Sequence, residues 1–501
     1  MKRTFLAWSL ILAAVPCTSA QQTASQNSPA PETIQVDTRA PGQPFPHFWE
    51  QMFGSGRAIL SLRQSYRDDL REVKSATGLK YVRFHAIFHD EVGIYDEDAA
   101  GKPIYNFSYV DQIYDGLLQA GVRPFIELSF MPKKLAAEPK YQDFWYKPNI
   151  SPPKSFEKWA ELVRQFAQHL VDRYGLDEVS QWYFEVWNEP NIDFWVGAPK
   201  EQTYFQLYDA AARALKEVSP RLRIGGPATA QAAWADRFIQ HTVHDNVPVD
   251  FVSTHVYGND SAPDVFGTHE QIPRTQMVCR AVRKVHDQIA ASARPHLPLI
   301  WSEFNASYMN EPDVTDSTYM GPWMADTIRQ CDGLVDMMSY WTFSDVFEEQ
   351  GVIKTPFYGG YGVIAEGGVP KAAFNAFAML HRLGAQRSQP DLANALVTKR
   401  ADGTLAVAVW NYADPGTTGT ARKVHVAISG RAGTQRYHVE LLDPDHGSAL
   451  ATWQTMGSPA SPTPDQYERL KRASTVTQKL DSTSSFMLPA HGLALIEVRP
   501  R

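Results

Sequence analysis

Cysteine is scarce in this chain, which has 501 residues and only three cysteines. Cys17 lies in the N-terminal segment, so Cys279 and Cys331 are the pair that remains for the body of the protein. This number and spacing exclude a disulfide-rich scaffold and match no zinc-binding pattern. Both cysteines lie in stretches with helical patterning. We expect two buried thiols, and a single disulfide between them is the alternative.

Long runs of one charge and long apolar runs are also absent. The formal net charge is −7 and no basic face is indicated, so we expect no nucleic-acid partner. The apolar run 5–15 is too short to span a bilayer, and no other segment is a candidate membrane span. A basic start before this run and small residues at 18–20 after it are typical of a secretory signal. We therefore expect a signal peptide over 1–20, a flexible leader over 21–32, and a secreted or periplasmic protein.

A glycine-rich phosphate-binding turn is missing as well. The first expected strand ends in Gly54-Ser55-Gly56, which lacks the third glycine of the dinucleotide fingerprint and argues against an open doubly wound sheet. The chain instead alternates strand-like and helix-like segments. The expected strands are 45–53, 81–85, 124–128, 182–187, 222–226, 250–257, 298–303 and 337–343, and the helices that follow them are 60–77, 109–120, 156–174, 204–218, 232–245, 275–291, 322–332 and 371–383. Eight such pairs predict an α/β fold, a (β/α)8 TIM barrel over 33–387.

From residue 388 to residue 501 the apolar pattern changes to a period of two, which predicts a C-terminal antiparallel β-sandwich. Strands at 396–399 and 405–410 flank Asp402-Gly403, a typical hairpin turn. The segment 33–40, at the start of the barrel domain, is a candidate to pair with this sandwich. Because no row of exposed aromatic residues marks its strands, we expect the sandwich to brace the barrel and not to carry a binding site of its own.

The fourth expected strand is the most informative stretch, because it ends abruptly at Asn188-Glu189-Pro190. Proline cannot continue a central strand ladder, so the strand stops there. An Asn-Glu pair at the C-terminal end of a buried strand lies where a TIM barrel carries its chemistry. A surface turn that happens to contain a carboxylate is the alternative.

A second carboxylate, Glu303, ends the seventh expected strand. In a closed barrel of eight strands the ends of strands four and seven can face each other across the axis. Two facing carboxyl groups are the minimum equipment for cleaving a glycosidic bond: one donates a proton to the leaving oxygen, and the other attacks the anomeric carbon or activates water. Their pKa values must differ, which mutual repulsion and unequal burial achieve.

Further motifs carry a family resemblance. They are Phe48-Trp49-Glu50 with Gly54-Ser55-Gly56, Arg83-Phe84-His85, Thr254-His255-Val256-Tyr257, residues 303–308, 340–349 and 357–362, and Met456-Gly457-Ser458-Pro459. Together with Asn188-Glu189-Pro190 and Trp301-Ser302-Glu303, they resemble glycoside hydrolase family 39, which holds β-xylosidases and α-L-iduronidases. The likeness spans nearly the whole mature chain.

The resemblance implies a role for each matching residue. Glu189 would be the general acid/base and Glu303 the nucleophile. Sugar would be bound by Asn188 at the 2-hydroxyl, by Trp341 as a platform, by Glu348 at ring hydroxyls, and by His85, His255, Tyr257 and Tyr308. The alternatives are core histidines, a packing tryptophan and a solvated Glu348. Arg83 would position carboxylates or form a structural ion pair.

These expectations combine into a retaining, exo-acting glycosidase, specifically a β-D-xylosidase that acts on xylo-oligosaccharides and needs no metal or cofactor. One alternative is a glycosidase of another glycan: an exopolysaccharide, a β-glucoside, an arabinoside or an iduronide. An inactive barrel that binds carbohydrate is the alternative from a different class of protein.

Overall fold

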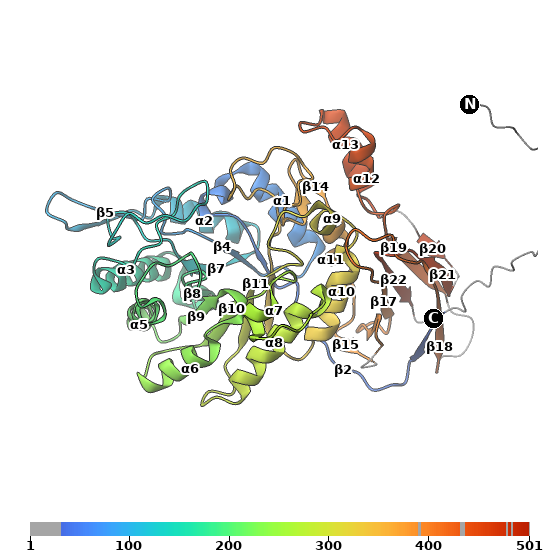
Figure 1. Cartoon of the computed structure of the whole chain (residues 1–501), viewed down its shortest axis with the longest axis horizontal. Coiled ribbons are helices and arrows are strands. Elements are labelled where there is room, and N and C mark those ends of the chain that lie inside the picture. Colours follow the sequence, from blue (N-terminus) through green and yellow to red (C-terminus); the bar gives the residue numbers. More distant parts are fainter. Residues whose placement is uncertain (1–31, 389–391, 431–435, 477–478, 482–483, 500–501) are drawn as a thin grey trace, which may run out of the picture.

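The computed structural model describes residues 32–388, 392–430, 436–476, 479–481 and 484–499. The expected signal peptide, and the leader up to residue 31, lie outside the described residues. A barrel with its ring of helices forms one side of the molecule, and two β-sheets pack against it on the other (Figure 1). Within the described part of the chain, no helix is both long enough and apolar enough to cross a membrane.

Eight parallel strands close into the predicted barrel, which confirms the expected fold class. They follow one another in chain order around the barrel, each paired with the next. The strands are β3 (Met52–Gly54), β4 (Tyr81–Phe84), β7 (Arg123–Leu128), β8 (Tyr183–Val186), β9 (Arg223–Thr229), β10 (Phe251–His255), β11 (Leu299–Phe304) and β12 (Met337–Tyr340). Nearly every residue of these strands is buried, as expected of strands enclosed by side chains inside and helices outside.

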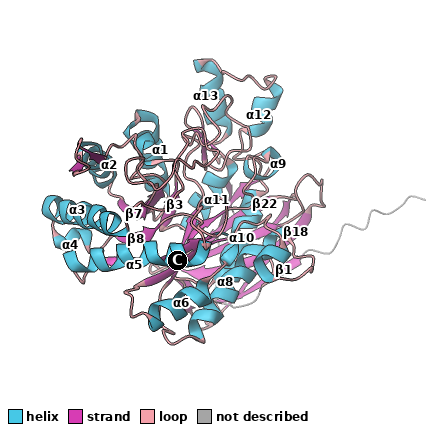
Figure 2. Cartoon of the chain, turned by 60° about the vertical axis from the view of Figure 1, so that its left-hand side comes forward, coloured by secondary structure: helices cyan, strands magenta, loops and turns pink. Residues whose placement is uncertain are grey.

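Helices cover the outside of the barrel, as Figure 2 shows from a second direction. The main ones are α1 (Gln64–Ala76), α2 (Ser108–Gln119), α3 (Phe156–Tyr174), α5 (Lys200–Val218), α6 (Ala235–His244), α8 (Arg274–Ala290), α10 (Met320–Cys331) and α11 (Ala372–His381). Local sequence sets the ends of α3: the Ser155 hydroxyl accepts a hydrogen bond from the N–H of Lys158, and Gly175 adopts a φ of 83° after the last turn.

The first barrel strand is shorter than expected. Residues 45–51 were expected to be strand, but the structure places them in a buried segment that leads into β3, which has only three residues. Its apolar side chains, Phe45, Phe48 and Trp49, pack in the main core. Pro46 lacks the N–H group that a strand ladder needs, which interrupts the segment although it is apolar.

The C-terminal part of the chain forms the predicted sandwich. A seven-stranded sheet contains β2 (Gln43–Pro44), β15 (Gln386–Arg387), β16 (Ala395–Lys399), β17 (Leu405–Asn411), β22 (Gly492–Val498), β19 (Tyr437–Leu442) and β20 (Lys479–Asp481), in that order. A three-stranded sheet contains β1 (Glu32–Asp37), β18 (Arg422–Ser429) and β21 (Ser485–Leu488). The N-terminal strand β1 pairs in parallel with β18, so the start of the described chain joins the sandwich.

The larger sheet is buried on both faces because its side chains alternate between two cores. In β17, Val407 and Val409 pack between the two sheets, while Ala408 and Trp410 belong to the main core, together with residues of α10 and α11. The side chains of β22 alternate in the same way. The second face of the sheet is thus filled by barrel helices, and the bracing role expected for it stays a prediction.

Two further features of the structure differ from the sequence-based expectations. The sulfur atoms of Cys279 on α8 and Cys331 on α10 form a disulfide, so the expectation of two thiols is wrong. The sandwich region also contains two helices, α12 (Leu450–Thr455) and α13 (Pro464–Ala473). Trp453 of α12 packs on Phe357, and Leu470 of α13 is buried in the same apolar cluster. The helix α12, with six residues, is too short for its periodicity to stand out from the sandwich pattern around it.

Candidate active site

Glu189 and Glu303 are positioned by β8 and β11, the fourth and seventh strands of the barrel. Beyond β8 the backbone turns sharply, with φ angles of 71° at Trp187 and 45° at Glu189. Such left-handed angles are costly for residues with a side chain and are concentrated at functional sites. The N–H of Glu189 donates to the carbonyl of Ala228 at 2.8 Å, which fixes the turn against the end of β9.

A cavity of 510 Å³ lies at this end of the barrel. Its volume is within the range of sites that bind small molecules, about 300–1,000 Å³. Eight of the nine residues predicted to form the site line it: His85, Asn188, Glu189, His255, Tyr257, Glu303, Tyr308 and Trp341. The structure therefore brings together side chains from strands that are far apart in the sequence.

The two carboxyl groups lie close to each other, with His255 between them. The Nδ1 atom of His255 is 3.0 Å from an oxygen of Glu189 and 3.7 Å from an oxygen of Glu303. The nearest atoms of all three side chains lie within 4.8 Å of one another. This short separation agrees with the retaining arrangement, about 5–5.5 Å, and leaves no room for the water that an inverting enzyme places between substrate and base, which needs about 6.5–9.5 Å.

Arg83 is the buried cation at the centre of the site. Its guanidinium donates to Glu303 at 2.6 Å, to Glu185 at 2.6 Å and to the side-chain oxygen of Asn188 at 2.9 Å. It also forms an ion pair with Glu127 at 2.7 Å. A buried guanidinium with these partners stabilises several carboxylates in fixed geometry. Arg83 therefore positions carboxylates, as expected, and is not among the described residues that line the cavity.

Both oxygens of Glu303 are held by donors. One accepts from Arg83, and the other accepts from the Tyr257 hydroxyl at 2.6 Å. Burial, followed by the charge of Glu303, raises the pKa of Tyr257 well above its ordinary value, so its phenol keeps the proton that it donates. A carboxylate held in this way is fixed in one orientation, which suits a nucleophile that attacks along a defined line.

Glu189 has a different environment from Glu303, although the two are neighbours. Burial, and after it the negative charges of Glu303 and Asp260, raise the pKa of Glu189 well above its ordinary value. Burial, with Arg83 as the next cause, lowers the pKa of His255 well below its ordinary value, so the imidazole is neutral. The Nε2 atom of His255 lies 3.1 Å from the Ser302 hydroxyl, which fixes the ring. Burial and the neighbouring acidic charges therefore favour the protonated form of Glu189.

His85 connects the charged centre to the cavity wall. Its Nδ1 atom lies 2.7 Å from Glu127, and its Nε2 atom lies 3.5 Å from Glu349. Burial disfavours the charged imidazole, but the carboxylates of Glu127, Glu303 and Glu349 together outweigh burial and raise the pKa of His85. The His85 ring is 4.8 Å from the Trp341 ring, so the two form one wall of the cavity.

Glu349, and not Glu348, is the glutamate of the eighth-strand loop that lines the cavity. The carboxylate of Glu348 points away and forms ion pairs with Arg63 and Arg57. The sugar contact implied for Glu348 is therefore not what the structure shows, because two arginines hold this side chain elsewhere. Burial raises the pKa of Glu349 to about 8. Sequence alone does not show which of two adjacent glutamates faces the cavity.

The position of Trp341 explains why residue 54, in the first barrel strand β3, is glycine. A side chain on Gly54 would place its Cβ 2.0 Å from the Trp341 ring, so the indole lies directly against the backbone of β3. The indole is buried against Tyr257, Phe347 and Tyr361, and it also lines the cavity. Tyr308 lies farther out, with 50% of its surface exposed, and marks the cavity rim.

The chain is similar to known proteins over nearly its whole length. The family described as glycosyl hydrolases family 39 matches residues 32–487. The β-xylosidase of Geobacillus stearothermophilus is 36% identical over 468 residues, which are 90% of this chain and 92% of that protein. The crystal structure of the GH39 enzyme from Xanthomonas axonopodis pv. citri has a TM-score of 0.86 and 33% identity, and the match covers 96% of this chain and 99% of that one. The monomeric β-xylosidase from Caulobacter crescentus CB15 has a TM-score of 0.84 and 33% identity, with 93% and 99% covered.

Proposed function

This chain belongs to glycosyl hydrolase family 39, and from that premise we propose that it is a retaining, exo-acting β-D-xylosidase. The observation that carries the proposal is the pairing of Glu189 and Glu303, whose carboxyl groups are close together but have unlike environments. Two β-xylosidases among its relatives match 86–90% of the chain, which supports xylose as the sugar released.

In the first step Glu303 attacks the anomeric carbon and forms a glycosyl ester, while the glycosidic bond breaks. Glu189 donates its proton to the departing oxygen, so the leaving group departs as an alcohol. Arg83 and Tyr257 keep the attacking carboxylate in line.

In the second step Glu189 accepts a proton from water, which attacks the anomeric carbon and releases Glu303. The ester has no negative charge, so the charge that contributed to the high pKa of Glu189 is removed during the first step. The pKa of Glu189 therefore falls when it must act as a base, which is the change that the two roles require.

A neutral sugar fits the cavity better than a uronate. Among the described residues that line it, none is lysine or arginine, whereas Asp260, Asp264, Glu349 and the catalytic pair are acidic. A uronate carboxylate would need a cationic partner there. This composition disfavours an iduronide substrate and favours a pentoside or hexoside.

The test is a panel of aryl β-xylosides, β-glucosides and α-arabinosides, with proton NMR of the first product. We expect the fastest turnover on the β-xyloside and initial release of β-xylose. Initial release of the α-anomer would contradict Glu303 as nucleophile. No release from any monosaccharide glycoside would favour an internal cleaver of a longer glycan or an inactive binding barrel.

Two variants distinguish the role of Glu189 as general acid from the role of Glu303 as nucleophile. Glu189→Ala slows substrates with poor leaving groups far more than activated aryl glycosides, because only the former depend on proton donation. Glu303→Ala abolishes turnover of both. If Glu189→Ala loses the same fraction of wild-type activity on both substrate types, Glu189 is not the general acid.

We also propose that the protein is exported to the periplasm or the medium. The apolar run 5–15 supports this location, as does the disulfide between Cys279 and Cys331, because such bonds persist mainly in oxidising compartments. N-terminal sequencing of the protein from the periplasmic fraction tests it. A mature start after residue 20 is expected, and an intact Met1 in the cytoplasmic fraction would contradict it.

A further inference from the structure

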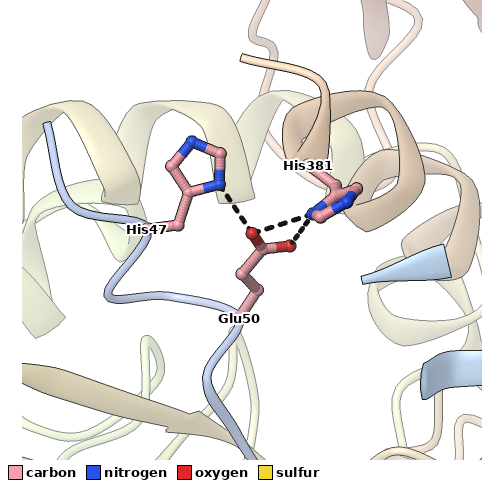
Figure 3. Close-up of side chains that lie close together, drawn as sticks. All are labelled: His47, Glu50 and His381. Atoms are coloured by element: carbon pink, nitrogen blue, oxygen red, sulfur yellow. Dashed lines mark hydrogen bonds and ion pairs between the residues drawn. The ribbon is translucent and has the colours of Figure 1, made fainter. Parts of the chain in front are cut away.

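A second group of metal-binding side chains lies at the opposite end of the barrel from the active site. It consists of His47, Glu50 and His381, here called the junction cluster (Figure 3). His47 and Glu50 belong to the segment that leads from β2 into β3, and His381 is the last residue of α11. Because this segment enters the barrel at the start of β3, the cluster is at the N-terminal ends of the strands.

The cluster also marks the two places where the chain crosses between barrel and sandwich. β2, which precedes His47, pairs with β15, which follows His381, within the large sandwich sheet. An ion held by these three side chains would link the segment that enters the barrel before β3 to the end of α11, where the chain leaves the barrel. The site is therefore separate from the glycosidase chemistry and does not depend on it.

The three side chains converge on one point. The Nδ1 atom of His47 is 2.6 Å from an oxygen of Glu50, and the Nδ1 atom of His381 is 2.9 Å from both Glu50 oxygens. The candidate ligand atoms all lie within 4.8 Å of one another. Figure 3 shows both rings directed at the same carboxylate.

The surroundings hold the carboxylate in place. Glu50 is 1% exposed and accepts a hydrogen bond from the N–H of Gly78 at 3.0 Å. A side chain at Gly78 would place its Cβ 2.9 Å from a Glu50 oxygen, so the backbone there forms a close-fitting wall. The His47 ring stacks on Trp49 at 4.5 Å, which limits its rotation. Outer contacts of this kind orient metal ligands.

We infer that the junction cluster binds a divalent transition-metal ion, with zinc as the best match. Two imidazole nitrogens and one carboxylate oxygen form a ligand set that suits zinc, and a water can complete four-coordination. The side chain of His381 is 44% exposed, so an ion and its water have a path from solvent. Binding requires that each imidazole presents an unprotonated Nδ1 to the ion, and that the two Nδ1 atoms move apart from the Glu50 carboxylate, because their hydrogen-bond distances of 2.6 and 2.9 Å are shorter than the separation of two ligands on one zinc ion.

The other groups of this kind in the described residues have different donors. Glu189, His255 and Glu303 form the catalytic centre, with one imidazole. Asp209, His241 and Asp245 also offer one imidazole and lie on the barrel exterior, on α5 and at the end of α6. This exterior cluster, with its single imidazole, provides a matched control.

The experiment uses the full chain without an affinity tag, stripped with EDTA and dialysed. Zinc chloride is titrated by calorimetry, and cobalt is added separately to read the visible absorption of a four-coordinate site. We expect a tight zinc phase and cobalt bands, both of which are lost in His381→Ala and His47→Ala. The control His241→Ala keeps both signals.

Gly78→Ala provides a second test that leaves all three ligands in the chain. Displacing Glu50 weakens zinc affinity by about 10- to 100-fold, the usual effect of disturbing outer contacts. Circular dichroism checks the fold of each variant, and if a histidine variant does not fold, Gly78→Ala decides the matter. The proposal is overturned if the wild type shows no tight zinc phase, or if the phase is unchanged in a folded His381→Ala or Gly78→Ala variant. The cluster would then serve only to connect the two segments by hydrogen bonds.

Discussion

At the scale of single residues, charge placement explains why two similar glutamates have different roles. Glu303 receives hydrogen bonds on both oxygens from Arg83 and Tyr257. Glu189 lacks a bond to the arginine and is surrounded by other acidic groups, among them Asp260. Burial and the neighbouring acidic groups therefore favour the protonated form of Glu189, whereas Glu303 is held as an acceptor by two donors.

Asp260→Asn tests this electrostatic coupling. The negative charge of Asp260 is one cause of the raised pKa of Glu189, so removing it lowers that pKa. Because Glu189 must be protonated for the first step, the alkaline limb of kcat/KM moves to lower pH. The pH profile with an aryl xyloside measures the shift. Asp260→Glu keeps the charge and keeps the limb near its wild-type position. An unmoved limb in Asp260→Asn would contradict the coupling.

Glu348 and Glu349 form a natural pair for comparison. Glu349→Gln removes a carboxyl that lines the cavity and is expected to lower kcat/KM by up to about 10-fold, the effect of losing one hydrogen bond to the substrate. Glu348→Gln instead removes the partner of Arg63 and Arg57, so it lowers the thermal midpoint and leaves kcat/KM near the wild-type value. Steady-state kinetics and thermal melts of both variants decide the matter, and the reverse pattern would restore the role first expected for Glu348.

The sequence predicts the placement of site residues on regular strands, whereas it does not predict the orientation of side chains in an irregular loop. Glu189 and Glu303 end barrel strands, so their placement follows from strand order. Glu348 and Glu349 lie in an irregular loop, where no period says which side chain points inward. Glu348 also has a φ of 62°, a local turn that no pattern of neighbouring residues indicates.

At the scale of elements, the same contrast holds for the helices and the disulfide. The strand and helix alternation predicted all eight barrel strands because each is a short run rich in aromatic and branched apolar residues, even where it contains one buried charge. The helix α13 was missed, although Thr463, Pro464 and Gln466 form a capping box with proline at the first turn, which was a readable start signal. The Cys279–Cys331 contact depends on the spacing of α8 and α10, which sequence periodicity does not give.

The disulfide predicts a measurable contribution to stability. It links two helices across a sequence separation of 52 residues, so it restricts the unfolded chain. Changing both cysteines to serine lowers the free energy of unfolding by about 2–5 kcal/mol, measured by urea denaturation. Wild-type protein under reducing conditions shows a similar loss, which separates the bond from any effect of the serines. Equal midpoints for oxidised and reduced wild type would show that the bond contributes nothing.

At the scale of the whole molecule, barrel and sandwich share a core. Leu493 on β22 and Leu442 on β19 face α10, where a Cβ added at Gly321 would be 3.2 Å from each. Their side chains belong to the same apolar cluster as the barrel helices. A barrel packed in this way against its neighbouring sheet is expected to unfold together with it and not as a separate domain.

Leu493→Ala tests whether the barrel and the sandwich unfold together. Its side chain is buried at the interface, and truncation to alanine in such a place costs about 2–5 kcal/mol. We expect one calorimetric transition in the wild type and one at lower temperature in the variant, with loss of xylosidase activity on heating at the same midpoint. Ala494→Gly is the matched control, because Ala494 faces the core between the two sheets and its change lowers stability without loosening the interface. If Leu493→Ala splits the transition so that activity survives sandwich melting, the barrel is stable alone and the sandwich does not brace it.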